Sequence, residues 1–305
     1  MITYKTLFKG FLLYAAGVAS ANATMYLTNA AGALYTVDTS NATVTLVGNL
    51  PPSGGGVGGC CDGYNEIAYD ETTGTAWAQE RNGNFRAQAF NVSDASGIGS
   101  AVENGASMHG WEFVDGTLYV AGFAGSLANG LGTIDPNVGV ASLVTIRDDW
   151  SSDTNDDVIT GLACSANVLY GITNGDDSGE SSLYSIATDG SLTLIGPTGM
   201  RAGSLEFGND GVLYAGGVSS QAGLLYSIDP TTGSSTLIGD TGVSSGGGIS
   251  GLMRTGSAPS ACNSIDGVVT PAAPATPVPA LPLWALWFLA GITGLIGSKK
   301  LRKST

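Results

Sequence analysis

The 305-residue sequence predicts an all-β protein, and in detail a five-bladed β-propeller. A unit of four short strands recurs about every 45 residues, which is the period of a propeller blade. Incomplete copies of the unit stand at the two ends of the repeat region, and each supplies the strands that the other lacks. The composition, 43% hydrophobic and 12% charged, excludes a disordered chain, and the 47 glycines follow no three-residue period, which excludes a collagen-like rod.

The outer half of each unit is a predicted β-hairpin. Apolar and polar residues alternate on both sides of a turn that reads Asp-Pro-x-x-Gly or an equivalent, and this pattern is typical of a hairpin. Four copies of the phrase occupy residues 34–38 with 45–48, 131–137 with 142–144, 183–187 with 193–196, and 225–233 with 236–239.

The inner half of each unit begins with a second phrase, whose central apolar residue we use as an anchor. The five anchors are Ile67, Trp111, Leu162, Leu205 and Leu252, with spacings of 44, 51, 43 and 47 residues. The last copy has no hairpin after it, and the hairpin at residue 34 has no first strand before it. We therefore expect the strand at Leu252 to join the strands of residues 25–48 in one blade, which leaves no open sheet edge. An open β-solenoid shares the period, but it does not predict complementary half-units.

The charge distribution excludes one class of partner. Residues 24–280 contain five arginines, no lysine and all 25 acidic residues, so this part of the chain carries a formal charge of 5 − 25 = −20. Such a surface repels phosphate backbones, and no nucleic-acid partner is expected.

The N-terminus predicts a secretory signal peptide over residues 1–23. Lys5 and Lys9 form a basic region, and an apolar stretch follows it. Ala21 and Ala23 supply the small-x-small pattern of a cleavage site, which would leave Thr24 as the new N-terminus. An uncleaved membrane anchor is the alternative.

The C-terminus predicts one transmembrane helix. Residues 281–297 are uncharged and would span about 25 Å as a helix, the short end of what a bilayer core needs. Trp284 and Trp287 stand near its start as interfacial aromatics do, and the basic cluster of residues 299–303 follows at once. The positive-inside rule places that cluster in the cytoplasm and residues 24–280 outside it.

The residues around the start of this span resemble the C-terminal sorting signals that exosortases recognise in Gram-negative bacteria, the PEP-CTERM group and its IPTL-type relatives. The motif residues are Val278, Pro279, Ala280, Leu281, Pro282 and Trp284. Ala280 and Leu281 depart from the Val-Pro-Glu-Pro form, and Trp284 at its spacing brings the motif closer to the IPTL type. The resemblance implies export, a transient stay in the inner membrane, processing near Pro279 by an exosortase-like enzyme, and delivery to the cell surface or an extracellular matrix. A plain single-pass anchor is the alternative.

The repeats also resemble a loose set of secreted bacterial propellers, whose blades read Gly-Leu-Ala, Leu-Tyr-Gly and Leu-Tyr-x-Ile-Asp-x-x-Thr-Gly. The resemblance covers most of residues 24–254 and implies the fold, but no particular chemistry. The expected layout is a signal peptide (1–23), a propeller (24–254), a linker rich in Pro, Ala and Ser (255–280) and a sorting tail (281–305).

Four cysteines, Cys60, Cys61, Cys164 and Cys262, suggest two disulfides in an exported chain. Because adjacent cysteines bond each other only with strain, we expect Cys60 and Cys61 each to reach one of the other two. A bond to Cys262 would fasten the linker to the propeller. Free thiols and a metal site are the alternatives, and one histidine without a Cys-x-x-Cys pair makes a poor metal ligand set.

Three carboxylates are candidates for catalysis. Glu66, Glu112 and Glu206 lie on predicted first strands, and their even offsets from one another relative to the anchors place them on one strand face. Carboxylates gathered around an axis could serve as the acid and base of a glycoside hydrolase. The competing interpretation is a water-filled channel or hydrogen bonds between blades. His109 also begins a first strand, but no Gly-x-Ser-x-Gly elbow accompanies it, and a structural or solvent-facing role is expected.

Two acidic loops, residues 148–157 and 174–180, are alternatives for a calcium site because they are rich in oxygen ligands. Neither has the spacing of a helix-loop-helix site, so a solvated loop is expected and no cofactor is required. The candidate ligands are Asp153, Asn155, Asp157, Asp176, Asp177 and Glu180.

Together these features predict an exported protein of the cell envelope or extracellular matrix whose propeller binds or scaffolds without catalysis. Its expected partners are the export machinery, the exosortase-like enzyme, the inner membrane in transit, and an extracellular polysaccharide or another surface protein. A secreted glycoside hydrolase that uses the axial carboxylates and a carbohydrate-binding propeller are the alternatives.

Overall fold

The structure is a computed structural model that describes residues 24–51, 63–80, 85–104, 106–125, 130–146, 158–175, 179–256 and 262–265. The chain divides into two units, Met1–Pro271 and Ala272–Thr305, and every described residue belongs to the first. Within these ranges no helix is long and apolar enough to cross a membrane. The signal peptide and the sorting tail lie outside the described residues.

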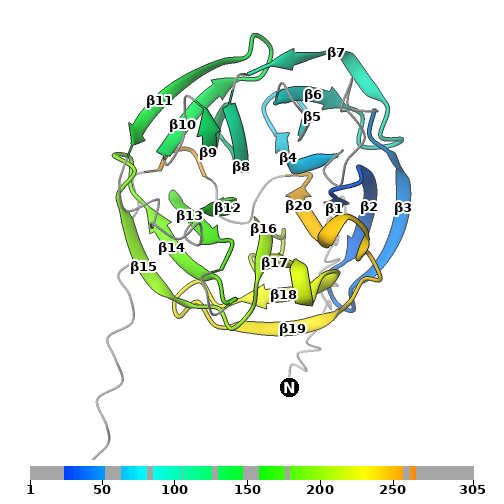
Figure 1. Ribbon diagram of the computed structural model, residues 1–305, viewed down its shortest axis with the longest axis vertical. Coiled ribbons are helices and arrows are strands. Elements are labelled where there is room, and N and C mark those ends of the chain that lie inside the picture. Colours follow the sequence, from blue (N-terminus) through cyan, green and yellow to red (C-terminus); the bar gives the residue numbers. More distant parts are fainter. Residues whose placement is uncertain are drawn as a thin grey trace, which may run out of the picture. The chain divides into compact units, whose positions relative to one another are not determined.

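Twenty strands form five antiparallel four-stranded sheets, which are arranged as blades around a common axis (Figure 1). The closing blade contains β20 (Ile249–Arg254), β1 (Met25–Asn29), β2 (Ala33–Asp38) and β3 (Thr43–Asn49). The second contains β4 (Tyr64–Asp70), β5 (Thr75–Glu80), β6 (Arg86–Phe90) and β7 (Gly97–Glu103). The third contains β8 (Ala106–Val114), β9 (Thr117–Gly125), β10 (Gly130–Asp135) and β11 (Val140–Ile146). The fourth contains β12 (Ile159–Ser165), β13 (Val168–Thr173), β14 (Ser182–Ile186) and β15 (Leu192–Pro197). The fifth contains β16 (Ala202–Phe207), β17 (Leu213–Gly217), β18 (Leu224–Ile228) and β19 (Ser235–Asp240). Two single-turn 3₁₀ helices, η2 (Ser219–Gln221) and η3 (Ser245–Gly247), lie in connections.

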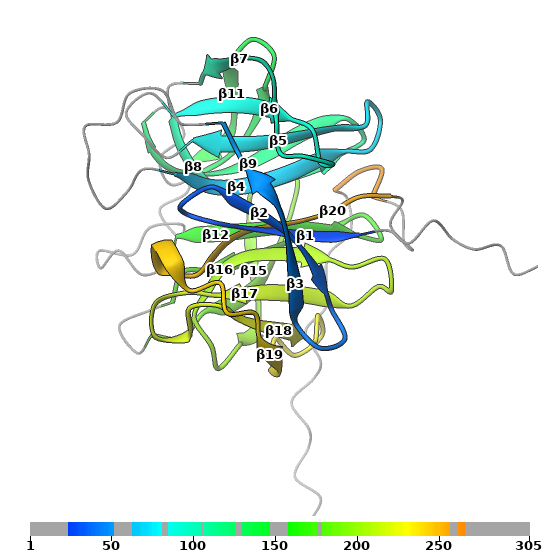
Figure 2. The same ribbon diagram turned by 90° about the vertical axis from the view of Figure 1, so that its right-hand side faces the viewer.

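The predicted five blades and the predicted closure are both confirmed. The last strand, β20, pairs antiparallel with the first, β1, with Met25 opposite Arg254 and Leu27 opposite Leu252. Figure 2 shows the two strands side by side, with β2 and β3 continuing the same sheet outward. Because the two ends of the repeat region share one sheet, the ring is held shut by a ladder of backbone hydrogen bonds.

Several turns between strands form where an acidic residue at the end of a strand accepts hydrogen bonds from the residues that follow it. In the β18–β19 turn, Oδ1 of Asp229 accepts the backbone N–H of Thr231 at 2.8 Å and its hydroxyl at 2.7 Å. Gly233 closes this turn with φ of +80°, a conformation that glycine adopts without a steric penalty. Asp38 and Asp70 organise the turns after their strands in the same way.

The hydrophobic core lies between the blades rather than inside one layer. Five clusters of buried side chains each join two neighbouring sheets. In one cluster Leu27 of β1 and Leu252 of β20 pack with Tyr214 of β17 and Leu225 of β18. The alternating pattern that predicted the strands therefore buries both faces of each blade, and each blade depends on its neighbours for stability.

Candidate functional site

The inner strands β4, β8, β12, β16 and β20 surround the axis (Figure 1). Each one packs against the inner strand of the next blade, and β20 packs against β4. Their first residues surround one axial cavity and their last residues surround another. Both cavities are candidate sites.

Glu66 on β4, Glu112 on β8 and Glu206 on β16 all lie on inner strands and are buried, with exposed fractions of 1%, 5% and 5%. Each carboxylate accepts a backbone N–H from the inner strand of a neighbouring blade. Oε1 of Glu66 accepts the N–H of Leu252 on β20 at 3.3 Å. Glu112 accepts that of Cys164 on β12, and Glu206 that of Arg254 on β20. The three candidate catalytic residues therefore cross-link blades around the axis.

Close approach of the inner strands depends on glycine at one of these contacts. A Cβ on Gly251 would lie 2.9 Å from Oε1 of Glu66, so a larger residue would displace the carboxylate from β20. Glu66 also accepts the N–H of Ile67 at 3.1 Å, while its Oε2 has no hydrogen-bond partner among the described residues.

Burial raises the pKa of all three carboxyl groups. Loss of solvation is the main cause for each, and for Glu112 the neighbouring Glu206 adds repulsion that Arg254 opposes. The pKa of Glu206 rises to about 7, because burial outweighs the attraction of Arg254 and the N–H of Phe207. Glu206 and Glu112 raise the pKa of Glu66 further. Glu112 and Glu206 therefore titrate as a coupled pair.

Glu112 and Glu206 line a cavity of about 240 Å³ at the end of the inner strands, which we call the acidic cavity. Glu71, Asp115 and Arg254 also line it. Glu66 is not among the lining residues, so the structure brings two of the three predicted carboxylates to one cavity.

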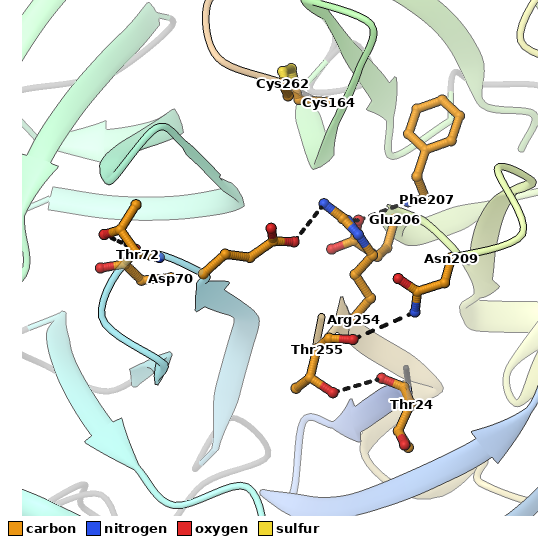
Figure 3. A network of polar contacts seen from close by, with 11 residues as sticks. Thr24, Asp70, Thr72, Cys164, Glu206, Phe207, Asn209, Arg254, Thr255 and Cys262 are labelled. Atoms are coloured by element: carbon orange, nitrogen blue, oxygen red, sulfur yellow. Dashed lines mark hydrogen bonds and ion pairs between the residues drawn. A yellow bond between two sulfur atoms is a disulfide. The ribbon is translucent and has the colours of Figure 1, made fainter. Parts of the chain in front are cut away.

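Arg254, the last residue of β20, supplies the positive charge of the acidic cavity. Its Nη2 lies 3.1 Å from Oε1 of Glu71, and its Nη1 lies 3.8 Å from Oε1 of Glu206 (Figure 3). These carboxylates and Glu112 raise the pKa of Arg254 against the opposing effect of burial. Arg254 stands two residues after its anchor, where the other four blades carry Tyr69, Phe113, Cys164 and Phe207. Arg254 is thus the one charged residue at this position of the repeat. This difference was visible in the sequence, but we did not predict a role for Arg254.

The disulfide pairing differs from the prediction. Cys164 bonds Cys262, with Cα atoms 5.8 Å apart and a sequence separation of 98. The expectation that Cys60 and Cys61 would each take one of these two is therefore wrong, because the folded chain brings residue 262 back to the end of β12. Cys60 and Cys61 themselves lie outside the described residues. The bond does fasten the segment after the propeller to the body, as a bond to Cys262 was expected to do.

The segment of residues 262–265 is anchored at three points beside the acidic cavity. Cys262 and Asn263 line the cavity, and the backbone N–H of Asn263 donates to Oδ1 of Asn167 at 3.0 Å. Ile265 is 4% exposed and packs in the cluster between the third and fourth blades. The chain beyond β20 thus covers part of this end of the axis.

The other cavity, of about 330 Å³, lies at the start of the inner strands, and we call it the polar cavity. Each inner strand contributes the residue two positions before its anchor: Asn65, His109, Thr160, Gly203 and Ser250. Asn174 and Arg201 add an amide and a guanidinium from the connections. None of the described residues that line it is Asp or Glu, so the two cavities differ in charge.

The side chains of the polar cavity are held by the backbone around them. The amide of Asn65 donates to the carbonyl of Met108 at 3.3 Å, and the hydroxyl of Thr160 lies within hydrogen-bond distance of the carbonyl of Ala202 at 3.2 Å. The hydroxyl of Ser250 donates to the carbonyl of Thr28 at 3.3 Å. Of these residues the sequence analysis singled out only His109. A comparison of the residues two positions before each anchor would have identified the others.

The remaining predicted sites are only partly within the described ranges. Glu180 is exposed, and no group of three possible metal ligands occurs among the described residues. Asp153, Asn155, Asp157, Asp176 and Asp177 lie outside them. So do Ala21 and Ala23 and the sorting motif from Val278 to Trp284. Thr24 is described, and its carbonyl accepts the N–H of Thr255 at 3.1 Å beside the acidic cavity (Figure 3).

No family model and no curated protein matches the chain. Among solved structures, a protein of unknown function from Bacteroides caccae is 11% identical, with a TM-score of 0.39 over 71% of this chain and 72% of that one. The aldose sugar dehydrogenase of Streptomyces coelicolor is 13% identical, with a TM-score of 0.43 over 70% and 77%. The GH74 xyloglucanase of Xanthomonas campestris is 14% identical, with a TM-score of 0.43 over 70% and 35%. These proteins include enzymes and one without an assigned function. The five-bladed architecture is established by the strand pairing of this chain itself.

Proposed function

We propose that this protein is an exported, non-catalytic binding protein of the bacterial cell envelope or extracellular matrix, which takes its ligand in the polar cavity. The observation that carries the proposal is the lining of that cavity. Five inner strands present the same register position there, and amide, hydroxyl, imidazole and guanidinium groups surround it without a carboxylate among the described residues. Such a site can bind a polar ligand, but it lacks the paired carboxylates that hydrolysis of a glycoside needs.

Export is supported by the two ends of the sequence and by the Cys164–Cys262 disulfide. Disulfides persist in oxidising compartments such as the periplasm and the cell surface, and they are rare in the cytosol. The tail after residue 280 would hold the protein in the inner membrane until an exosortase-like enzyme releases it.

The binding role is tested by a variant that fills the polar cavity. Ser250→Phe places a ring where Ser250 now makes one bond to a neighbouring backbone carbonyl, and Ser100→Phe makes the same change at an exposed position on β7. We expect the full-length protein to bind oligosaccharides from acidic and neutral polysaccharides in calorimetric titrations. Binding should be lost in Ser250→Phe and kept in Ser100→Phe. Equal binding in both variants would move the site elsewhere.

The export role is tested by the mass and location of the mature chain in a host that carries an exosortase. We expect loss of the first 23 residues and of about 25 C-terminal residues, with the product outside the inner membrane. An intact tail in the inner membrane would mean a plain anchor, and the binding would then take place in the periplasm.

A glycoside hydrolase remains the second candidate, and the acidic cavity favours it. Glu112 and Glu206 line the same cavity and both have raised pKa values, which suits a group that must donate a proton. Their use as cross-links between blades favours the structural role. Release of sugar from a polysaccharide panel that is abolished in both Glu112→Gln and Glu206→Gln would establish hydrolysis and overturn the non-catalytic proposal.

A further inference from the structure

Arg201 is the one described arginine that forms no ion pair with a described carboxylate. Of the three arginines that the structure describes, Arg86 donates from Nε to Oε2 of Glu80 at 2.7 Å, and Arg254 pairs with Glu71 and Glu206. Arg201 forms no ion pair with any described residue. In a body with a formal charge of −20, an arginine left without an acidic partner at a cavity is unexpected on composition alone.

A hydrogen bond from Nε holds the guanidinium of Arg201 at the polar cavity. Arg201 directly precedes β16, and its Nε donates to the carbonyl of Asn174 at 2.9 Å. Its backbone N–H donates to Oε1 of Gln221 in η2. These bonds fix the stem and leave the two Nη groups for a ligand, which is the fork that binds a carboxylate with two parallel hydrogen bonds.

The rest of the polar cavity suits neutral hydroxyl groups. Asn65, Asn174, Thr160 and Ser250 supply amides and hydroxyls, which can donate and accept. The volume of about 330 Å³ falls at the lower end of small-molecule pockets. No Phe, Tyr or Trp lines it among the described residues, so hydrogen bonds and charge would supply the affinity rather than stacking on a large ring.

The rim on one side of the cavity has no side chains. Gly246, Gly247 and Gly248 follow one another with φ of +74°, +99° and +118°, and all three line the cavity. A side chain on any of them would be strained, so backbone groups face the space there. A rim of this kind lets a ligand extend out of the cavity, as the end of a polymer must.

We propose that the polar cavity binds the carboxylate-bearing end of an acidic polysaccharide, a uronic acid residue, with Arg201 as the partner of the carboxylate. This inference rests on the proposed function and names the ligand class of the same site. One unpaired guanidinium matches one negative charge. A phosphate monoester would bring close to two negative charges to a body that already repels anions. His109 is the body's one imidazole and also lines this cavity.

The test compares oligosaccharides that carry a single uronic acid at one end with the same oligomers after methyl esterification, because the ester removes the one charge and keeps the hydroxyl groups. Each is titrated calorimetrically into the full-length protein at low salt. We expect the acid to bind about 10- to 100-fold more tightly than the ester, the range expected for a charged hydrogen-bonded pair. Added salt should reduce this difference.

Three variants assign the effect. Arg201→Gln should abolish the preference for the acid, and Arg201→Lys should keep part of it because the charge remains without the fork. Arg86→Gln removes one positive charge from the body away from the cavity and should leave the preference unchanged. Thermal melts confirm that each variant is folded.

The outcomes separate the two proposals. If acid and ester bind equally and Ser250→Phe abolishes both, the cavity binds neutral sugars, so the proposed function stands and the assignment of Arg201 is wrong. If neither binds, and neutral oligosaccharides do not bind either, both proposals are overturned. If the acid binds more tightly but Arg201→Gln keeps the preference, the carboxylate lies elsewhere and this inference fails.

Discussion

The guanidinium of Arg254 lies 3.1 Å from the carboxylate of Glu71, and this ion pair joins the last strand of the propeller to the turn after β4. The closing blade and the second blade are therefore linked by charge at the same seam where Glu66 accepts the N–H of Leu252. Arg254 also faces Glu206 of the fifth blade. One residue of the closing strand thus contacts acidic groups of both neighbouring blades, and this arrangement makes the stability of the ring depend on pH.

Stability should fall as the pH rises from about 5 to about 8. The pKa of Glu206 rises from 4.5 to about 7 on folding, so the folded state holds a proton that the unfolded state releases between those values. Its contribution is fully present below pH 4.5 and is lost as the pH rises through 7, a change of about 3 kcal/mol. Glu66 and Glu112 act in the same direction. Urea denaturation at pH 5 and pH 8 measures the change.

Glu206→Gln should flatten this pH dependence, since a Gln oxygen can still accept the N–H of Phe207 and cannot ionise. Glu180→Gln removes an equal charge from an exposed position and serves as the control. A pH dependence that is the same in both variants would show that general repulsion in the acidic body is responsible, rather than the buried group.

Arg254→Met should destabilise the protein most at high pH. Its removal leaves Glu206 and Glu112 without a positive neighbour, and breaking a buried ion pair costs roughly 3–5 kcal/mol. At pH 5 Glu206 is protonated, and the loss should shrink. Denaturation at both pH values checks this, with Arg201→Gln, which breaks no ion pair among the described residues, as the matched loss of one charge. An equal loss at both pH values would mean that the arginine stem matters through packing alone.

Removal of the disulfide by Cys262→Ser should lower stability by about 2–4 kcal/mol, because the bond closes a loop of 98 residues in the unfolded chain. The effect should also be local. Hydrogen exchange at residues 262–265 should become fast, while β12 stays protected by its own sheet and by the cluster around Leu162. Unchanged exchange in this segment would show that Ile265 and the Asn263–Asn167 bond hold it without the disulfide.

Two glycines with similar backbone angles separate strain from a steric clash. Gly242 has φ of +72°, and a Cβ added to it would have no neighbouring atom within 4 Å. Gly233 has φ of +80°, and a Cβ added to it would lie 2.5 Å from the carbonyl oxygen of Gly196. Gly242→Ala should cost about 1 kcal/mol through backbone strain. Gly233→Ala should cost clearly more, because it also pushes the fifth blade away from the fourth. Equal losses in denaturation would mean that the turn relaxes without moving the blades.

The repeat itself could be predicted because its signals are local. Alternation of apolar and polar residues sets the strands, and an acidic residue such as Asp229 before Pro-x-x-Gly closes the hairpin through contacts two or three residues away. The half-unit at Leu252 predicted ring closure because a propeller leaves no free edge. The strands and turns needed a window of about one blade, and closure needed only a comparison of the two end copies.

Only the tertiary structure decided what the axial residues do, because their partners come from other blades. The carboxylate of Glu66 binds a backbone group 186 positions away, and Cys164 bonds a cysteine 98 positions away. Spacing placed Glu66, Glu112 and Glu206 near the axis, but it could not show that each accepts an N–H of a neighbouring blade or that Arg254 lies beside Glu206. The ring brings the same register position of five strands together at one cavity. That convergence, set by the packing of blades, makes Arg201 and the polar residues around it a candidate site.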